Sequence, residues 1–282
     1  MALRRLRSLL RAYRPWLRRA VPGKLRRRLR KLTRATNEAR DAEVQLAWLK
    51  QHRLRLTARE RAGVEWFRSE LTARCDRTYR HIREELTHDF AQVETALRAT
   101  FTRAIRRGRA AGPPFRAVTV GLVDEHAGAL RAALAGIGSP GDEAKIHAAR
   151  IAAKRLRYLL EPVAPLLSAG REHIKTLKQF QDDFGLLNDS FVRARALADA
   201  AQLAGGLRAR RLMDRALGAA DSADEGIDPL AGLLRLAAMV KRETRARYAH
   251  VERRYLNAGA DRFITTVLHV TRELARTPGT MQ

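Results

Sequence analysis

The stretch His147–Glu161, HAARIAAKRLRYLLE, decides the fold of this chain. A helical projection at about 100° per residue divides it into two faces. One face is a ladder of cations that begins with a histidine: His147, Arg150, Lys154 and Arg157, with Tyr158 at its edge. The opposite face is apolar: Ala149, Ala152, Ala153, Leu156, Leu159 and Leu160. The pattern predicts an amphipathic helix that buries one face in a core and offers positive charge on the other.

A second, degraded copy of this helix begins the chain. Shifting the second half back by 150 positions aligns Ile151–Leu160 with Met1–Leu10, and both segments are rich in arginine. A further block, at an offset of 148, contains four aligned pairs: Leu177 with Leu29, Phe180 with Leu32, Asp189 with Asp41, and Val192 with Val44. Such a repeat predicts two helical bundles related by a pseudo-two-fold, each bringing one cationic helix to a shared place.

The first copy of the motif lacks the first two polar residues of the second copy, because His147 and Arg150 have no counterparts after Met1. Either the first motif is truncated or the start codon was assigned late. We favour the second explanation, since Met1 stands where an Ile or Val is expected.

Helical spacing continues along the whole chain, and no segment shows convincing period-two alternation, so we expect an all-α fold. The expected helices are Leu3–Leu17, Lys24–Gln51, Thr57 to about Thr102 with a break near Thr87, Val118–Leu134, the stretch quoted above, Ile174 to about Gln202, Leu207–Leu217, Leu230–Asn257 and Arg262–Arg276. Gly205-Gly206 is expected to break a helix, and Gly136–Gly141 to separate the halves. We therefore predict a single domain over residues 1–282, with a first bundle at 1–135, a second bundle at 136–276 and a frayed tail at 277–282.

The charge of the chain points to a polyanionic partner. The 282 residues are 45% hydrophobic, which is a globular composition, and they include 56 Lys+Arg against 30 Asp+Glu, a formal net charge of +26. Such a charge imposes self-repulsion on a compact state, which nucleic acid, an anionic membrane surface or a polymeric phosphate would relieve. A genome rich in G and C would raise the Arg content as well, but it does not explain the sign of the net charge.

Other classes of protein are excluded by simple counts. Cys75 is the single cysteine, so the chain has no intramolecular disulfide and no cysteine metal cluster. The longest apolar run, Leu230–Val240, is shorter than the roughly 18–20 residues of a membrane span and contains Arg235. No signal peptide pattern is present, so the cytoplasm is the expected compartment.

The motifs of both halves resemble those of the CHAD family, the conserved-histidine α-helical domains. The second-half motifs are His147-x-x-Arg150-x-x-x-Lys154-Arg155-Leu156-Arg157-Tyr158 and Leu177-x-x-Phe180-Gln181-x-x-Phe184-Gly185-x-x-Asn188-Asp189. The first-half counterparts are Arg4-Arg5-Leu6-Arg7 and Arg40-Asp41-Ala42-Glu43-Val44. The resemblance implies two four-helix bundles with a basic groove between them, binding of inorganic polyphosphate and an association with polyphosphate granules.

Under this interpretation the ligand contacts are the cations of the repeated helices and their neighbours. The expected polyphosphate-binding residues are Arg4, Arg5, Arg7, Arg11, Arg30, His147, Arg150, Lys154, Arg155, Arg157, Tyr158 and Lys178. His147 would donate a hydrogen bond to a phosphate oxygen, with binding coupled to protonation; the alternative is a capping or core histidine. Tyr158 would donate its hydroxyl at the rim. Arg5 and Arg155 point away from the ladder, toward either a flank of the ligand or solvent.

Further residues form weaker candidate sets. The groove could also be lined by Arg74, Arg77, His81, Lys175, Lys241 and Arg245, although solvated faces are the commoner fate of such runs. Asp41 and Asp189 cannot contact phosphate, so we expect them to orient the arginine ladders, or else to be helix caps or surface ion pairs.

We expect no catalytic residue, no metal site and no cofactor, because the chain has no His-x-x-x-His and no P-loop. Non-enzymatic polyphosphate binding is the leading hypothesis. Non-specific binding of nucleic acid is the alternative, without a recognisable nucleic-acid motif, and a polyphosphate-processing phosphohydrolase is a third. No membrane partner is expected, and the sequence leaves the oligomeric state open.

Overall fold

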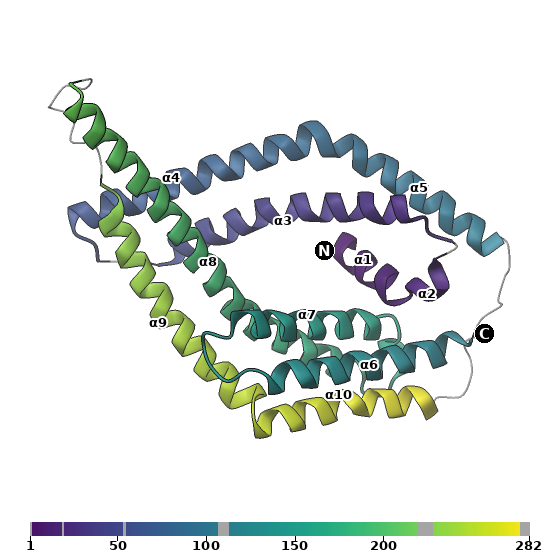
Figure 1. Ribbon diagram of the computed structural model, residues 1–282. Helices are drawn as coiled ribbons and strands as arrows, with labels where there is room; N and C mark the ends of the chain where they lie inside the picture. The colour runs from purple at the N-terminus through teal and green to yellow at the C-terminus, as the bar shows by residue number, and fades with distance from the viewer. Residues whose placement is uncertain (1, 19, 53–54, 107–112, 219–227, 277–282) are drawn as a thin grey trace. The chain divides into compact units, whose positions relative to one another are not determined.

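Helices make up all the regular structure in the computed structural model, which describes residues 2–18, 20–52, 55–106, 113–218 and 228–276 (Figure 1). They are α1 (Ala2–Ala12), α2 (Arg14–Leu17), α3 (Gly23–Gln51), α4 (Ala58–His81), the π-helical turn η1 (Ile82–Leu86), α5 (Thr87–Arg106), α6 (Phe115–Ala135), α7 (Glu143–Leu160), the 3₁₀ turn η2 (Ala164–Leu166), α8 (Gly170–Ala216), α9 (Leu230–Tyr255) and α10 (Ala258–Arg276). The predicted all-α class is confirmed. The predicted tail at 277–282 lies outside the described residues.

Helix α7 buries the apolar face that its sequence predicts. All six residues of that face are buried, with exposed fractions between 0% and 8%: Ala149, Ala152, Ala153, Leu156, Leu159 and Leu160. The helix packs against α6, which packs in turn against α10, and Figure 1 shows these neighbours running alongside one another. Pro162 follows the last turn, where a proline cannot continue the helix.

The described chain divides into two compact units, and each draws on both halves of the sequence. Unit 1 comprises residues 1–34, 86–188 and 246–282, and unit 2 comprises residues 35–85 and 189–245. Their boundaries therefore differ from the predicted bundles at 1–135 and 136–276, and the pseudo-two-fold relation of those bundles stays a prediction. Helices α3, α8 and α9 each contribute residues to both units.

An aromatic cluster forms part of the core of unit 1. The Phe180 ring is fully buried and stacks on Phe184 and Phe263, with ring centroids 4.1 and 4.8 Å away, while Tyr255 meets it edge-on at 4.9 Å. These rings come from α8, α9 and α10, so the cluster joins three helices that are remote in sequence. Large buried rings of this kind contribute strongly to core stability.

The core of unit 2 is assembled from segments of four helices. Buried Trp48, Phe67, Leu197 and Leu236 come from α3, α4, α8 and α9 respectively. The Trp48 indole donates to the Glu243 carboxylate at 3.1 Å, and the Arg193 guanidinium lies 5.1 Å from the indole centroid. The apolar faces predicted for these segments thus pack together in one core.

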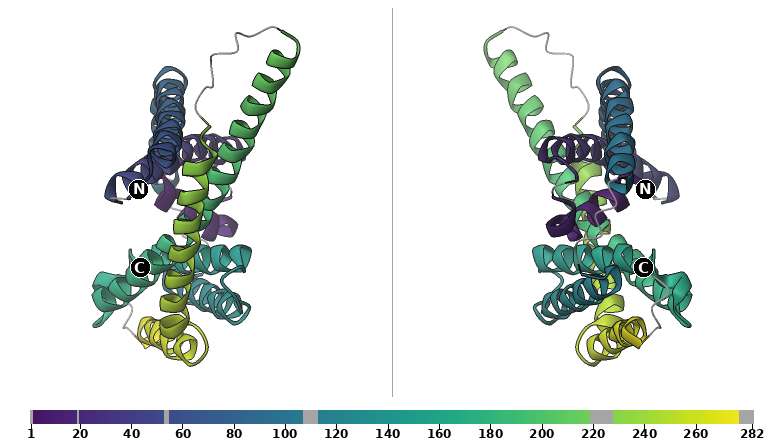
Figure 2. Two further views of the ribbon diagram at one scale, coloured as in Figure 1. Left: turned by 90° about the vertical axis from the view of Figure 1, so that its left-hand side faces the viewer. Right: turned by 90° about the vertical axis from the view of Figure 1, so that its right-hand side faces the viewer.

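The structure of α8 differs from the sequence prediction at Gly205-Gly206. The predicted break there is wrong, because α8 continues without interruption for 47 residues, and Figures 1 and 2 draw it as one helix. A glycine inside a helix costs about 1 kcal/mol relative to alanine. Ala204 and Leu197 of α8 are buried in the core of unit 2, and this packing offsets the cost. Gly185 also lies inside this helix.

Two other breaks are informative. The predicted helix Leu3–Leu17 divides at Tyr13, whose hydroxyl lies 2.8 Å from Thr119 Oγ1 and whose ring stacks on Phe115. The predicted break near Thr87 is present as the π-helical turn η1, which ends one residue earlier. Thr57 caps α4 as expected, in a reciprocal capping box with Glu60.

Asp142 precedes the first residue of α7, but its carboxylate accepts from the loop amides of Gly138 and Ser139, at 2.8 and 3.1 Å, and not from the helix. Within the residues that the structure describes, no helix is both long and apolar enough to cross a membrane.

Candidate functional site

The two cationic helices of the repeat are neighbours within unit 1, where α1 packs against α7. All twelve residues expected to bind polyphosphate belong to this unit, on α1, α3, α7 and α8. We use the name cationic cluster for five of them: Arg4, Arg7, Arg150, Lys154 and Arg157. Chain segments about 150 positions apart thus place their basic side chains together.

Lys154 lies at the centre of the cationic cluster. Burial lowers the pKa of its ammonium group to about 8, and the positive charges of Arg4, Arg150, Arg157 and Arg7 add to the shift. A cation whose neighbours are all cations is held in an environment that disfavours its own charge. This is the environment that a bound anion would relieve.

Arg7 has a similar environment on α1. Burial lowers the pKa of its guanidinium, and Arg30, Arg11 and Arg4 lower it further. Arg30 is exposed on α3, so the first turns of that helix add charge to the same surface. Within the described parts of the chain, neither Arg7, Arg150 nor Lys154 forms an ion pair with a carboxylate. The side chains therefore keep their positive charge available to a ligand.

One carboxylate, that of Glu161, borders the cationic cluster. Its Oε1 lies 3.0 Å from Arg157 Nη1, and its Oε2 lies 2.8 Å from Arg5 Nε. Arg5 belongs to α1 and Glu161 follows α7, so the pair joins the two helices. Arg157 and Glu161 are both well buried, with side-chain exposures of 15% and 16%. Glu161 thus links Arg157 of α7 to Arg5 of α1, and the orienting role expected of Asp41 and Asp189 stays a prediction.

Tyr158 lies deeper than its predicted position at the rim, since the residue is only 2% exposed. Its ring faces two cations: the Arg157 guanidinium carbon is 5.0 Å from the ring centroid and Lys154 Nζ is 5.9 Å from it. The negative face of an aromatic ring stabilises such cations by about 0.5–2 kcal/mol. Tyr158 therefore supports the cluster with its ring as well as offering a hydroxyl.

His147 is exposed at the start of the ladder, and its Nδ1 lies 2.9 Å from Oδ1 of buried Asn188 on α8. An amide oxygen only accepts, so Nδ1 is the donor in this contact. The expected hydrogen bond from His147 to a phosphate oxygen stays a prediction. The alternative of a core histidine does not fit its exposure.

A cleft of about 440 Å³ adjoins the other edge of α1 and α7. Its cationic lining comes from Arg11, Arg14 and Arg155, and Trp16 and Glu125 also line it. The pKa of the Arg155 guanidinium is lowered by burial and by Arg11. The sequence left open whether Arg155 points toward a flank of the ligand or toward solvent. In the structure Arg155 lines this cleft.

His126 of α6 also lines the cleft, and sequence reasoning missed it. Burial lowers the pKa of its imidazole, Glu125 opposes that shift, and the charges of Arg155 and Arg11 reinforce it. Periodicity gave no signal for His126, because α6 has no cationic face. Glu161 and Asn188 were visible in the motif, but only the folded structure shows which side chains they meet.

The remaining candidates are more dispersed. In unit 1, Lys178 and Lys175 are exposed on α8, and Lys175 Nζ lies 3.8 Å from Glu172 Oε1. The other candidates belong to unit 2: Arg74, Arg77, His81, Lys241, Arg245, Asp41 and Asp189. The first five of these are exposed on α4 and α9, as a solvated face would be. Within unit 1 the structure thus brings together the cations of α1 and α7.

Comparison with known proteins gives a family and a fold. The family model described as CHAD domain matches residues 1–198. Among solved structures, the crystal structure of the CHAD domain from the plant Ricinus communis is similar, with a TM-score of 0.60 and 20% identity. The similarity covers 96% of this chain and 80% of the plant chain. No curated protein matches.

Proposed function

The chain belongs to the CHAD domain family, and from this premise we propose that it binds inorganic polyphosphate at the cationic cluster without catalysing a reaction. Polyphosphate offers only oxygens and about one negative charge per unit. A protein can hold it, as it holds a nucleic-acid backbone, with several Arg and Lys contacts and release of counterions. Bidentate arginine forks suit such oxygens well.

The observation that carries the proposal is the packing of α1 against α7, which gathers four arginines around the half-buried Lys154. Arg7, Arg150 and Lys154 form no ion pair with a carboxylate among the described residues, and burial together with the four arginines lowers the pKa of Lys154 to about 8. Like charges held together in the free protein cost stability. A bound polyanion removes that repulsion, and its relief contributes to the free energy of binding.

Neutralisation of three cluster cations tests the proposal. The variant Arg7→Gln, Arg150→Gln and Lys154→Gln is expected to bind long-chain polyphosphate about 100-fold or more weakly, since hydrogen bonds between charged groups contribute about 1.5–3 kcal/mol each. The slope of log K against log salt should fall by about 2, at roughly 0.7 per contact. Both quantities come from titrations at several salt concentrations.

A matched control removes the same charge elsewhere. Arg80→Gln, Arg103→Gln and Arg242→Gln change three exposed arginines outside the cluster, so general electrostatic attraction would weaken binding equally in both variants. The proposed site requires that the control retain nearly all of its affinity. Equal losses in the two triple variants would show that the net charge, and not this cluster, binds the ligand.

Single-stranded nucleic acid is a second candidate, and Trp16 favours it. This side chain is 44% exposed and lines the cleft beside Arg11 and Arg14, where a base could stack at a gain of about 1–3 kcal/mol. Trp16→Ala should weaken nucleic-acid binding while leaving polyphosphate binding unchanged. Displacement of polyphosphate by nucleic acid at equal phosphate concentration would favour this candidate over the first.

We propose that the protein is a binding module of the cytoplasm, associated with polyphosphate granules, and not a phosphohydrolase. A turnover assay with polyphosphate and divalent metal is expected to release no phosphate. Sustained release that is lost in the cluster variant would overturn the non-enzymatic assignment while leaving the binding site in place.

A further inference from the structure

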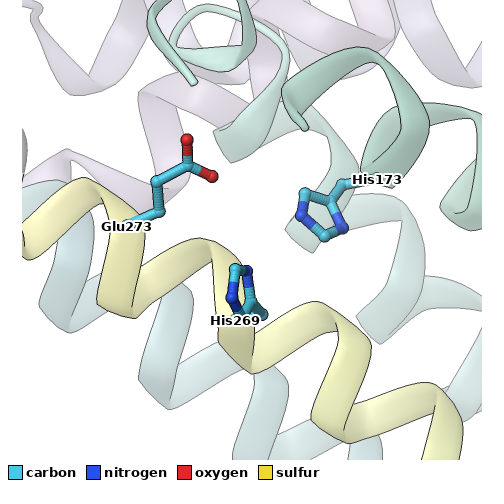
Figure 3. A group of neighbouring side chains, drawn as sticks. All are labelled: His173, His269 and Glu273. Atoms are coloured by element: carbon cyan, nitrogen blue, oxygen red, sulfur yellow. The ribbon is translucent and has the colours of Figure 1, made fainter. Parts of the chain in front are cut away.

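Three potential metal ligands converge in unit 1, and none of them belongs to the cationic cluster. His173 lies in the first turns of α8, and His269 and Glu273 lie one turn apart on α10. Figure 3 shows the two imidazole rings and the carboxylate arranged around a common space. One ligand atom from each residue lies within 4.8 Å of the other two. Helix geometry brings His269 and Glu273 together, since residues four apart share a helix face.

The buried histidine indicates that this space is built for a ligand. His173 is only 8% exposed, and its Nε2 has no hydrogen-bond partner among the residues that the structure describes. Leaving a buried polar nitrogen without a partner costs about 1–3 kcal/mol. The His173 and His269 ring centroids are 6.2 Å apart and tilted by 39°, so the rings do not stack. A metal ion would supply the missing partner.

Glu273 is held in place from the other side. Its Oε1 accepts the backbone N–H of Ser168, in the turn before α8. Such second contacts orient a carboxylate ligand and are a regular feature of metal sites. Ser168 of the turn and His173 of the following helix therefore face α10 from one short segment of chain.

From this geometry we infer that His173, His269 and Glu273 form a binding site for a divalent transition metal, with Zn²⁺ as the best fit. Two imidazoles and one carboxylate are a donor set that Zn²⁺ accepts, with a fourth position open to water. Ligand atoms around tetrahedral zinc are about 3.3 Å apart, for bonds of roughly 2.0–2.1 Å. The exposed His269 ring can close the difference of about 1.5 Å by rotating. Ca²⁺ and Mg²⁺ prefer oxygen ligands and fit less well.

A metal ion bound at this site would also affect stability. The ion would join the start of α8 to the last turns of α10, and it would stabilise the folded state because the unfolded chain has no such site.

Titration of the untagged full-length protein with Zn²⁺ alone tests the inference. We expect one site with a Kd in the micromolar range or tighter by calorimetry, an increase in Tm, and a tetrahedral Co²⁺ absorption spectrum. His269→Ala changes an exposed residue and is expected to weaken binding at least tenfold. His88→Ala, an exposed histidine on α5, is the matched control and should bind as the natural protein does.

Glu273→Gln provides a second variant, since it can keep the hydrogen bond to Ser168 while losing the anionic ligand. Its metal affinity should fall by about tenfold or more. Absence of Zn²⁺ binding at 100 μM, or equal affinity in the natural protein and His269→Ala, would overturn the inference. The inference does not depend on polyphosphate: the Arg7, Arg150 and Lys154 triple variant should bind Zn²⁺ normally.

Discussion

Lys154 illustrates how one residue couples folding to binding. A neutral side chain of its size would pack against the same surroundings without charge repulsion, yet the chain places an ammonium there, with its pKa lowered to about 8 by burial and four arginines. Perturbed ionisable groups of this kind are typical of functional sites. Tyr158 reduces the cost through its ring face, and Glu161 offsets part of the charge of Arg157.

Binding of polyphosphate should be accompanied by proton uptake at Lys154. Because the pKa in the free protein is about 8, about half of these side chains are neutral at pH 8, and a bound polyanion favours the ammonium form. Calorimetry at pH 8 in buffers of different ionisation enthalpy should show uptake of about half a proton from this site, and affinity should fall as the pH rises further. Lys154→Arg keeps the charge without titrating, so its uptake at pH 8 should be smaller. Identical uptake in both proteins would contradict this role.

Removal of the charge at Lys154 should stabilise the free protein. The folded-state pKa, about 8, is below the ordinary value of 10.5, so the unfolded chain binds more protons between these two pH values. Stability therefore rises with pH across this window, and the full cost of the charge is present below pH 8. Lys154→Met should raise the Tm at pH 7, with a difference that shrinks toward pH 10.5, while polyphosphate binding weakens. A lower Tm at pH 7 would show that Lys154 has stabilising contacts instead.

At the scale of elements, glycines that look alike in the sequence have opposite roles. Gly205 and Gly206 lie inside α8 with open space where a Cβ would project. Gly63 of α4 and Gly232 of α9 are buried where the two helices touch, and a Cβ on Gly63 would lie 2.5 Å from the carbonyl oxygen of Pro229. The first pair weakens a helix, whereas the second pair permits a close approach of two helices in unit 2.

Alanine substitutions should separate these roles. Gly205→Ala and Gly206→Ala are expected to raise the free energy of unfolding by about 1 kcal/mol each, from helix propensity. Gly63→Ala should lower it by about 1–3 kcal/mol through overpacking, and so should Gly232→Ala, whose Cβ would lie 2.5 Å from the Glu60 carbonyl oxygen. Urea unfolding followed by circular dichroism measures both effects. A loss of stability on substitution at Gly205 would indicate a kink in α8.

At the scale of the whole molecule, the net charge of +26 acts on the free and bound states in opposite ways. In the free protein, cations repel one another across the surface and most strongly at the cationic cluster. In a polyphosphate complex the same charges attract the ligand. Salt screens both interactions, since the Debye length falls from about 10 Å at 0.1 M to about 3 Å at 1 M.

Salt should therefore raise the Tm of the free protein and reduce the increase in Tm caused by polyphosphate. The first effect comes from screened repulsion. The second comes from weaker binding, because ligand stabilisation grows as RT ln(1 + [L]/Kd). Thermal melts between 0.05 and 0.5 M NaCl, with and without polyphosphate, measure the two trends together. Parallel trends in both series would count against a complex held by counterion release.

The sequence by itself determined what depends on local spacing. Helical periodicity predicted the all-α class and the buried face of α7, because the positions that share a helix face follow from the number of residues per turn. The repeat likewise selected the cations of α1 and α7 as partners. Local spacing failed at Gly205-Gly206, where the packing of unit 2 outweighs the helix propensity of two glycines.

Only the tertiary structure decided which charges meet. It brought Arg4 and Lys154 together, paired Glu161 with both Arg5 and Arg157, and left Asp41 and Asp189 in unit 2. It also gathered His173, His269 and Glu273, which share no motif in the sequence. The physical reason is that burial and Coulomb energies depend on distances through space, and these are set by the packing of helices far apart along the chain.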